Sequence, residues 1–256
     1  MQAVDPDLWI RRFHPAGPGF PRLVCLPHAG GAASYYVPVS KALSPDVEVL
    51  AIQYPGRQER LSERRRETVA ELADEVTEAI RPLTDQPLYL FGHSLGATVA
   101  YEVARRMEAA GTRPAHLFVS SRRAPELNRN ERLHERGDQE LVKHIRSLAG
   151  TAPDVFDDPE MTAMVLPAIR SDYKAAETYV YAPGPKLTCP VTALIGDADP
   201  MVSAEEATAW SKHTDGAFQL RIWPGGHFYL DAHAADVIAR ISAEIPARAR
   251  QGQRTM

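Results

Sequence analysis

The sequence predicts an α/β fold with a mostly parallel central sheet flanked by helices, and two features of the 256-residue chain lead to this prediction. Short apolar runs alternate with longer amphipathic segments, as in successive strand–helix units. Several of these runs are almost continuously apolar, which is typical of strands covered on both faces of a sheet. Because 44% of the residues are hydrophobic, a chain of this length can bury one sizeable core, and we expect a single domain over residues 1–256.

Six segments are expected to form the strands of this sheet. They are Leu23–Leu26, Val47–Tyr54, Pro87–Phe91, His116–Ser120, Val191–Ile195 and Phe218–Trp223. The helical pattern is clearest over Glu67–Leu83, where apolar residues recur at helical spacing and acidic residues occupy the other side. The other helices expected around the sheet are Ser34–Leu43, Leu95–Ala110, Ala204–His213 and Phe228–Ile245.

A long interval, at about residues 121–188, separates the fourth and fifth expected strands. It is too long for one crossover helix, and two or three helices fit within it, one of them around Gln139–Leu148 and another within Pro159–Tyr179. An insertion of this kind either caps the sheet or forms a lid over a substrate site. The motifs described below favour a lid.

Composition excludes several classes of protein. The 29 basic and 33 acidic residues give a formal charge of −4, which argues against a nucleic-acid-binding protein. No apolar run approaches the ~20 residues that span a bilayer, and the N-terminus lacks the features of a secretory signal, so we expect a cytoplasmic protein. Cys25 and Cys189 both have apolar neighbours, which favours buried reduced thiols. No Cys or His cluster has metal-ligand spacing, so no metal site is expected.

The strongest local motif is G-x-S-x-G at residues 92–96, directly after an expected strand and before an expected helix. This context is the one that a nucleophilic serine on a tight strand-to-helix turn requires. Gly92 and Gly96 allow the close turn, and Ser94 is therefore the predicted nucleophile. A chance match in a loop is the alternative, and the flanking strand and helix argue against it.

A serine nucleophile needs a histidine base and an orienting acid, which follow it along the chain in this type of fold. His227 lies in a glycine turn after the last expected strand and is the predicted base. Asp197 and Asp199 both follow the preceding strand. We favour Asp199 as the acid, because the usual position is a few residues past the strand and before a D-x-x-V step, and we assign Asp197 to backbone hydrogen bonds within the turn.

A loop of small residues, His28-Ala29-Gly30-Gly31, follows the first expected strand. Similar loops in esterases contribute an amide to the oxyanion hole. The backbone amides of Ala29 and Leu95 are therefore the expected oxyanion donors. Together with the serine, acid and base, this loop predicts an α/β-hydrolase fold.

The chain also resembles a narrower group, the type II thioesterases that accompany polyketide and nonribosomal peptide synthases. The matching stretches are LPHAGGAASYY, QYPGRQER, FGHSLGA, LPAIRSDYKAAETY, GDADPMV and GGHFYL, which are spread over residues 26–230. QYPGR combined with PxxRxDYxxxExY is more diagnostic than FGHSLGA alone.

This resemblance implies hydrolysis of acyl thioesters on the phosphopantetheine arm of acyl or peptidyl carrier proteins, chiefly to remove aberrant groups that block a synthase. It assigns the triad to Ser94, Asp199 and His227 and the oxyanion amides to Ala29 and Leu95. It implies no cofactor, since the phosphopantetheine belongs to the substrate. A carrier protein is the implied partner, and a monomer is the default expectation.

Two groups of side chains are candidates for handling this substrate. Acidic carrier proteins could dock on basic clusters, although a charge run is more often a solvated face. These clusters are Arg57, Arg60, Arg64–Arg66, Arg122 and Arg123. The acyl chamber is expected to draw on apolar insertion residues that could equally be insertion core, namely Met161, Met164, Val165, Leu166 and Ile169.

Three alternatives remain open from the sequence. The chain could be a carboxylester hydrolase acting on small free esters, although the QYPGR and insertion motifs argue against it. It could be a non-catalytic ligand-binding protein of the same fold, since fold does not fix function. It could also be a thioesterase domain from the end of a synthase, although the starting Met and the short ends favour a standalone protein.

Overall fold

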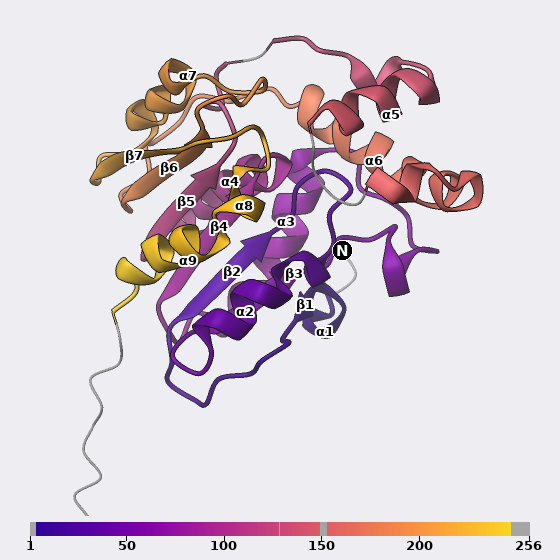
Figure 1. The fold of residues 1–256 in the computed structure, drawn as a ribbon. Helices are drawn as coiled ribbons and strands as arrows, with labels where there is room; N and C mark the ends of the chain where they lie inside the picture. Colours follow the sequence, from indigo (N-terminus) through magenta and orange to yellow (C-terminus); the bar gives the residue numbers. More distant parts are fainter. Residues whose placement is uncertain (1–3, 128, 149–152, 247–256) are drawn as a thin grey trace, which may run out of the picture.

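The computed structural model describes residues 4–127, 129–148 and 153–246, and its central feature is a seven-stranded sheet (Figure 1). The strand order is β1-β3-β2-β4-β5-β6-β7, and all neighbouring strands are parallel except β1 and β3. The mostly parallel sheet is thus confirmed, and the unexpected strand is β1 at the edge. The strands are β1 (Ile10–Arg11), β2 (Arg22–Leu26), β3 (Glu48–Ile52), β4 (Leu88–His93), β5 (His116–Ser120), β6 (Val191–Gly196) and β7 (Phe218–Trp223).

Helices cover both faces of the sheet, and the central strands β4, β5 and β6 are buried on both sides for this reason. Along β2, Leu23 and Cys25 belong to one buried cluster, whereas Val24 and Leu26 belong to the other, as expected for a strand whose side chains alternate. The cluster with Val24 and Leu26 includes residues of α3 (Val69–Ile80) and α4 (Leu95–Ala109), and these two helices lie together behind the sheet in Figure 1. The cluster with Leu23 and Cys25 includes residues of α2 (Val37–Leu43) and α9 (Ala234–Ala243), and these two helices lie in front of the sheet. The short N-terminal α1 (Pro6–Trp9) buries Trp9.

Four segments that were each expected as one helix are divided in the structure. The first is the 3-10 helix η1 (Ala33–Tyr36) followed by α2, and the second is α7 (Ala204–Thr208) followed by η6 (Ala209–His213). The third is α8 (Tyr229–Ala232) followed by α9, with a break at His233, whose φ of −114° and ψ of 26° are not helical. The fourth is α3 followed by η3 (Arg81–Leu83), and a separate 3-10 turn is η2 (Gln58–Arg60).

The chain between β5 and β6, called the insertion below, contains both helices expected there. Its elements are η4 (Leu133–Glu135), α5 (Asp138–Ser147), η5 (Pro153–Phe156) and α6 (Pro159–Glu177). Leu141, Leu166 and Ile169 form a small core of their own between α5 and α6. Figure 1 shows both helices beyond the carboxyl ends of the strands, where the loops with the predicted catalytic residues also lie.

Candidate active site

The predicted nucleophile lies on a strained turn between β4 and α4. Ser94 has a φ of +55° and a ψ of −117°, a backbone conformation that residues other than glycine rarely adopt. Helix α4 begins at the next residue. Glycines make this turn possible. A Cβ atom on Gly92 would lie 2.1 Å from the carbonyl oxygen of Gly96, and one on Gly96 would lie 2.1 Å from that of Leu26. The fold therefore presents Ser94 where the sequence places a nucleophile.

The structure brings the predicted base and acid together at the ends of β7 and β6. The Nδ1 atom of His227 lies 3.0 Å from each carboxylate oxygen of Asp199, and both side chains are buried. A carboxylate only accepts hydrogen bonds, so Nδ1 carries the proton and Nε2 is left with a free lone pair. Asp197 instead accepts a hydrogen bond from the Gly225 amide at 2.9 Å, within the turn. The geometry supports the choice of Asp199 over Asp197 as the partner of the base.

The loop after β2 supplies the other expected feature, a free amide close to the serine. Ala29 and Ser94 line the same cavity, together with His227. Among the described residues, neither the Ala29 nor the Leu95 amide has a protein acceptor in the hydrogen-bond network. Both amides are therefore available for a substrate oxygen.

This cavity has a volume of about 470 Å³, and the insertion provides much of its wall. Of the five insertion residues expected to line it, Met161, Met164, Val165 and Ile169 do so. For Leu166 the alternative holds, since its side chain packs in the insertion core with Leu141 and Ile169. Further apolar residues from the insertion line the cavity, namely Ile145, Leu148, Val155, Phe156 and Ala168.

Two buried histidines lie close to His227, and sequence reasoning assigned them no role. Burial, together with the nearby His227, lowers the pKa of His28 to about 3 and that of His93 well below its usual value. The His93 ring centroid lies 5.2 Å from that of His227, and its Nδ1 atom lies 2.9 Å from the Ser120 hydroxyl. Both rings are therefore uncharged at neutral pH, and they add bulk without placing a second positive charge beside the base.

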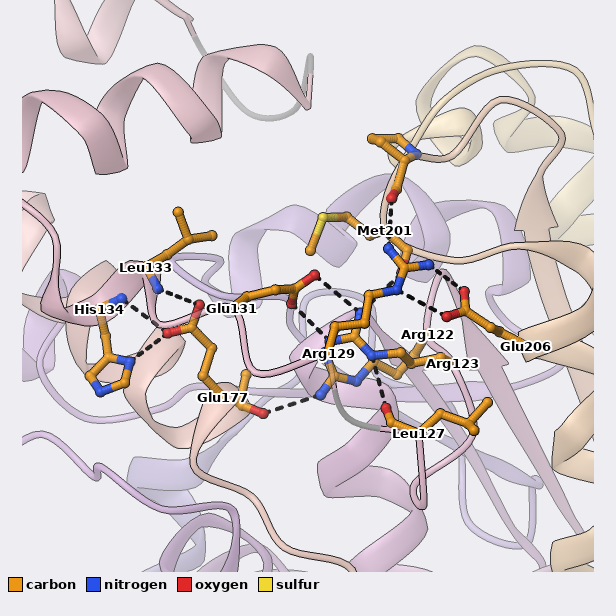
Figure 2. Close-up of polar contacts among 12 residues, drawn as sticks. Arg122, Arg123, Leu127, Arg129, Glu131, Leu133, His134, Glu177, Met201 and Glu206 are labelled. Atoms are coloured by element: carbon orange, nitrogen blue, oxygen red, sulfur yellow. Dashed lines mark hydrogen bonds and ion pairs between the residues drawn. The ribbon is translucent and has the colours of Figure 1, made fainter.

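Arginines at the start of the insertion hold the loop that carries Asp199 (Figure 2). Arg123 donates to the carbonyl oxygen of Met201 at 3.2 Å, and Arg129 donates to that of Pro200 at 3.0 Å. The Met201 amide in turn donates to Asp199 at 2.8 Å. Sequence reasoning missed this role, because a run of arginines carries no sign of which carbonyl groups it will meet.

The far end of the insertion is fastened to the same segment. Figure 2 shows Glu177, at the end of α6, accepting hydrogen bonds from the backbone amides of Leu133 and His134, at 2.8 and 3.0 Å. Arg122 donates to the carbonyl oxygen of Ala176 at 3.2 Å. The beginning and the end of the insertion are thus joined to each other and, through Arg123, to the acid loop.

Several arginines considered above as docking candidates are engaged inside the molecule. Arg57, Arg60 and Arg123 are 7%, 2% and 5% exposed. Their ion pairs are with Asp172, Glu63 and Glu131, respectively. These three residues therefore offer no free positive surface to a partner. Arg64 and Arg65 are the exposed members of the set, and Arg64 pairs with Glu71.

The remaining sequence expectations concern metals, membranes and thiols. Within the described ranges, no group of three His, Cys, Asp or Glu side chains has the arrangement of a metal site. No helix in the same ranges is long and apolar enough to cross a membrane. Cys25 and Cys189 are both buried and unpaired, as expected.

Comparison with known proteins gives a consistent result. A family model described as a thioesterase domain matches residues 21–245. The chain is 51% identical over 241 residues to thioesterase PikA5 of Streptomyces venezuelae, and this alignment covers 93% of this chain and 86% of PikA5. It is 38% identical over 223 residues to thioesterase TesA of Mycobacterium marinum, and this alignment covers 86% of this chain and 89% of TesA.

Solved structures agree with these matches. The structure of BorB, the type II thioesterase from the borrelidin biosynthetic cluster, superimposes with a TM-score of 0.89 at 52% identity, covering 94% of this chain and 98% of BorB. RedJ, the thioesterase from the prodiginine pathway of Streptomyces coelicolor, superimposes with a TM-score of 0.83 at 39% identity, covering 90% and 88% of the two chains.

Proposed function

The chain belongs to the thioesterase family, and from this premise we propose that it is a type II thioesterase of polyketide or nonribosomal peptide biosynthesis. Its substrates are acyl groups, chiefly aberrant ones that stall a synthase, carried as thioesters on the phosphopantetheine arm of a carrier protein. The observation that carries the proposal is the hydrogen-bonded His227–Asp199 pair beside an apolar cavity that Ser94 also lines.

In the acylation step, the Ser94 hydroxyl attacks the thioester carbonyl carbon and passes its proton to Nε2 of His227. The carbonyl oxygen becomes negative and accepts hydrogen bonds from the amides of Ala29 and Leu95. The carbon–sulfur bond then breaks, and His227 returns the proton to the departing pantetheine sulfur. The product of this half-reaction is an acyl ester on Ser94.

In the deacylation step, a water molecule attacks the acyl ester and His227 takes its proton. The same two amides hold the second oxyanion. The bond to Ser94 breaks, His227 gives the proton back to the serine oxygen, and the free acid leaves. Asp199 keeps Nδ1 of His227 protonated through both steps and stabilises the imidazolium that forms.

The proposal requires no cofactor, because the nucleophile, the base and the oxyanion donors all belong to the chain and the pantetheine belongs to the substrate. The partner is an acyl or peptidyl carrier protein. We place the enzyme in the cytoplasm as a monomer, and light scattering behind a sizing column tests its mass in solution.

The decisive experiment measures hydrolysis of a panel of acyl groups on three carriers: a carrier protein, coenzyme A and nitrophenol. The Ser94→Ala variant is the control. Preference for the carrier-bound thioester that disappears in this variant supports the proposal. Turnover of the nitrophenyl ester without use of any thioester would instead indicate a general carboxylester hydrolase, and binding without turnover would indicate a ligand receptor.

A further inference from the structure

A single buried carboxylate joins helix α6 of the insertion to the loop that carries the expected oxyanion donor. Asp172 is 1% exposed. Its Oδ2 atom accepts a hydrogen bond from the Gly30 amide at 2.8 Å. The same oxygen accepts from Nη1 of Arg57 at 2.8 Å, and Oδ1 accepts from Nη2 of Arg57 at 2.8 Å. Arg57 also donates to the carbonyl oxygen of Gly31 at 3.0 Å. One ion pair thus holds the peptide unit that follows Ala29 and the carbonyl group of Gly31, whose own amide donates to the His28 carbonyl oxygen at 2.9 Å, in the peptide unit that carries the Ala29 N–H.

Steric contact reinforces these hydrogen bonds. Gly30 has a φ of +77°, which favours glycine, and a Cβ atom added to it would lie 2.6 Å from Cγ1 of Ile169 on α6. The helix therefore rests directly on the loop. No other residue type at position 30 would allow both this backbone conformation and this close approach.

The segment that carries Arg57 is itself tied to the end of the same loop. The side-chain oxygen of Gln53 accepts a hydrogen bond from the Ala33 amide at 2.7 Å. Gln53 is fully buried at the end of β3, four residues before Arg57. The loop is consequently held at Gly30, Gly31 and Ala33 by groups from two distant parts of the chain.

Stability alone gives a poor reason for such a pair. Desolvating two charges costs as much as their attraction returns in many proteins, and apolar side chains of similar volume often serve as well. What the ion pair provides here, and an apolar pair could not, is an acceptor for the Gly30 amide and a donor for the Gly31 carbonyl group. The first bond orients the peptide unit that follows Ala29, and the second holds the loop two residues further on.

We propose that Asp172 and Arg57 are positioning residues of the reaction, which keep the Ala29 amide directed at the oxyanion. The inference rests on the acyl-enzyme function proposed above. It makes α6 part of the frame of the active site as well as a wall of the cavity. Neither residue reacts with the substrate, and both act through the loop.

The test uses two variants and one matched control. Asp172→Asn removes the charge that Arg57 binds. The double variant Asp172→Leu with Arg57→Met replaces the whole pair by apolar side chains of similar volume, which avoids an unpaired buried charge. The control is Ser171→Ala. Ser171 is the neighbouring buried residue on α6, and its hydroxyl donates to the carbonyl oxygen of Arg66 at 3.0 Å, away from the loop.

Three quantities are measured on each folded variant: the thermal midpoint, kcat and KM for a carrier-bound acyl group, and the rate at which a fluorophosphonate labels Ser94. Labelling depends on the same oxyanion donors as hydrolysis. Removing one such donor outright lowers kcat by about 10²–10³, so a misdirected donor should lower kcat and the labelling rate in parallel by about 10- to 100-fold, with KM nearly unchanged. The double variant should regain the thermal midpoint of the wild type but neither rate, and the control should keep both rates.

Several outcomes would overturn the inference. One is a double variant that regains the rates together with its stability, because the pair would then be purely structural. Another is a fall in hydrolysis with labelling unchanged, because the defect would then lie outside the oxyanion hole. If the wild type hydrolyses no thioester at all, the proposed function fails, but the labelling rates still decide whether Asp172 and Arg57 position the loop.

Discussion

Replacement of Gly96 by alanine should damage catalysis far more than stability. Gly96 is the second residue of α4, and a Cβ atom there would lie 2.1 Å from the carbonyl oxygen of Leu26. Cβ atoms essentially never approach another atom within 3.0 Å, so the two backbones must separate by about 0.9 Å. Leu26 ends β2 and precedes the loop that carries Ala29, whereas α4 carries the Leu95 amide. The separation therefore moves the two expected oxyanion donors apart.

The magnitudes follow from this displacement. A misplacement of about 1 Å at a reacting centre can cost a factor of about 10², so kcat should fall by about two orders of magnitude. Overpacking costs about 1–3 kcal/mol, and replacing glycine inside a helix returns up to about 1 kcal/mol. The net loss of about 0–2 kcal/mol would lower the thermal midpoint of a chain of this size by no more than about 8 °C.

The assay compares kcat and the thermal midpoint of Gly96→Ala with those of Gly137→Ala. Gly137 is the exposed N-cap of α5, and a Cβ atom there would meet no atom within 4 Å. This control should leave both quantities unchanged. If Gly96→Ala is folded and keeps kcat within about 3-fold of the wild type, the argument that close packing sets the positions of the two amides is refuted.

Three further predictions concern the acid, the buried histidines and the cavity. Asp199→Asn should lower kcat for thioester hydrolysis by about 10⁴, and Asp197→Asn by less than about 10-fold, since only Asp199 contacts His227; equal losses would contradict the assignment. The low pKa values of His28 and His93 mean that the unfolded chain takes up protons first as the pH falls below about 6.5. The free energy of unfolding in urea should therefore fall from pH 7 to pH 5, by up to about 1.4 kcal/mol per pH unit for each ring, whereas a flat profile would show that the rings are not held neutral. Ala168→Leu fills part of the cavity and should lower kcat/KM for long acyl groups by at least about 10-fold while sparing short ones; competition between two chain lengths measures this, and a uniform loss would place Ala168 outside the acyl path.

The elements of the sheet could be predicted because their signals are local. Several of the six expected strands are short, almost continuously apolar runs, and burial on both faces makes such a run stand out. Strand β1 escaped prediction because two residues, Ile10 and Arg11, are too few for a period to appear. The division of the last helix at His233 escaped for a related reason, since the apolar spacing continues across a break that only the backbone angles reveal.

The residues of the candidate site were likewise predictable only where their signal is local in the sequence. Ser94 and its two glycines form one local motif. The strand-then-turn context points to His227 and to the Asp197–Asp199 turn, within which the D-x-x-V step favours Asp199. The role of Arg57 could not be predicted, because its partner Asp172 lies 115 residues further along the chain. A charged residue in a sequence is expected to be solvated, and only the folded chain shows that this one is buried and paired.

The insertion reaches both catalytic loops, and the burial of its contacts indicates which connection matters more. The Arg129–Glu206 pair beside the acid loop has side chains 37% and 21% exposed, and pairs of this kind contribute about 0–1 kcal/mol. In the Arg57–Asp172 pair beside the oxyanion loop, the corresponding values are 8% and 1%. Breaking such a pair costs about 3–5 kcal/mol, because it leaves a buried charge without a partner.

Movement of α6 away from the sheet would have to break this pair, so the segment around Asp172 must stay in place while an acyl group enters the cavity. Entry has to occur elsewhere, and Leu61, Met161 and Met164, which are 41%, 39% and 49% exposed while lining the cavity, lie where its wall is accessible to solvent.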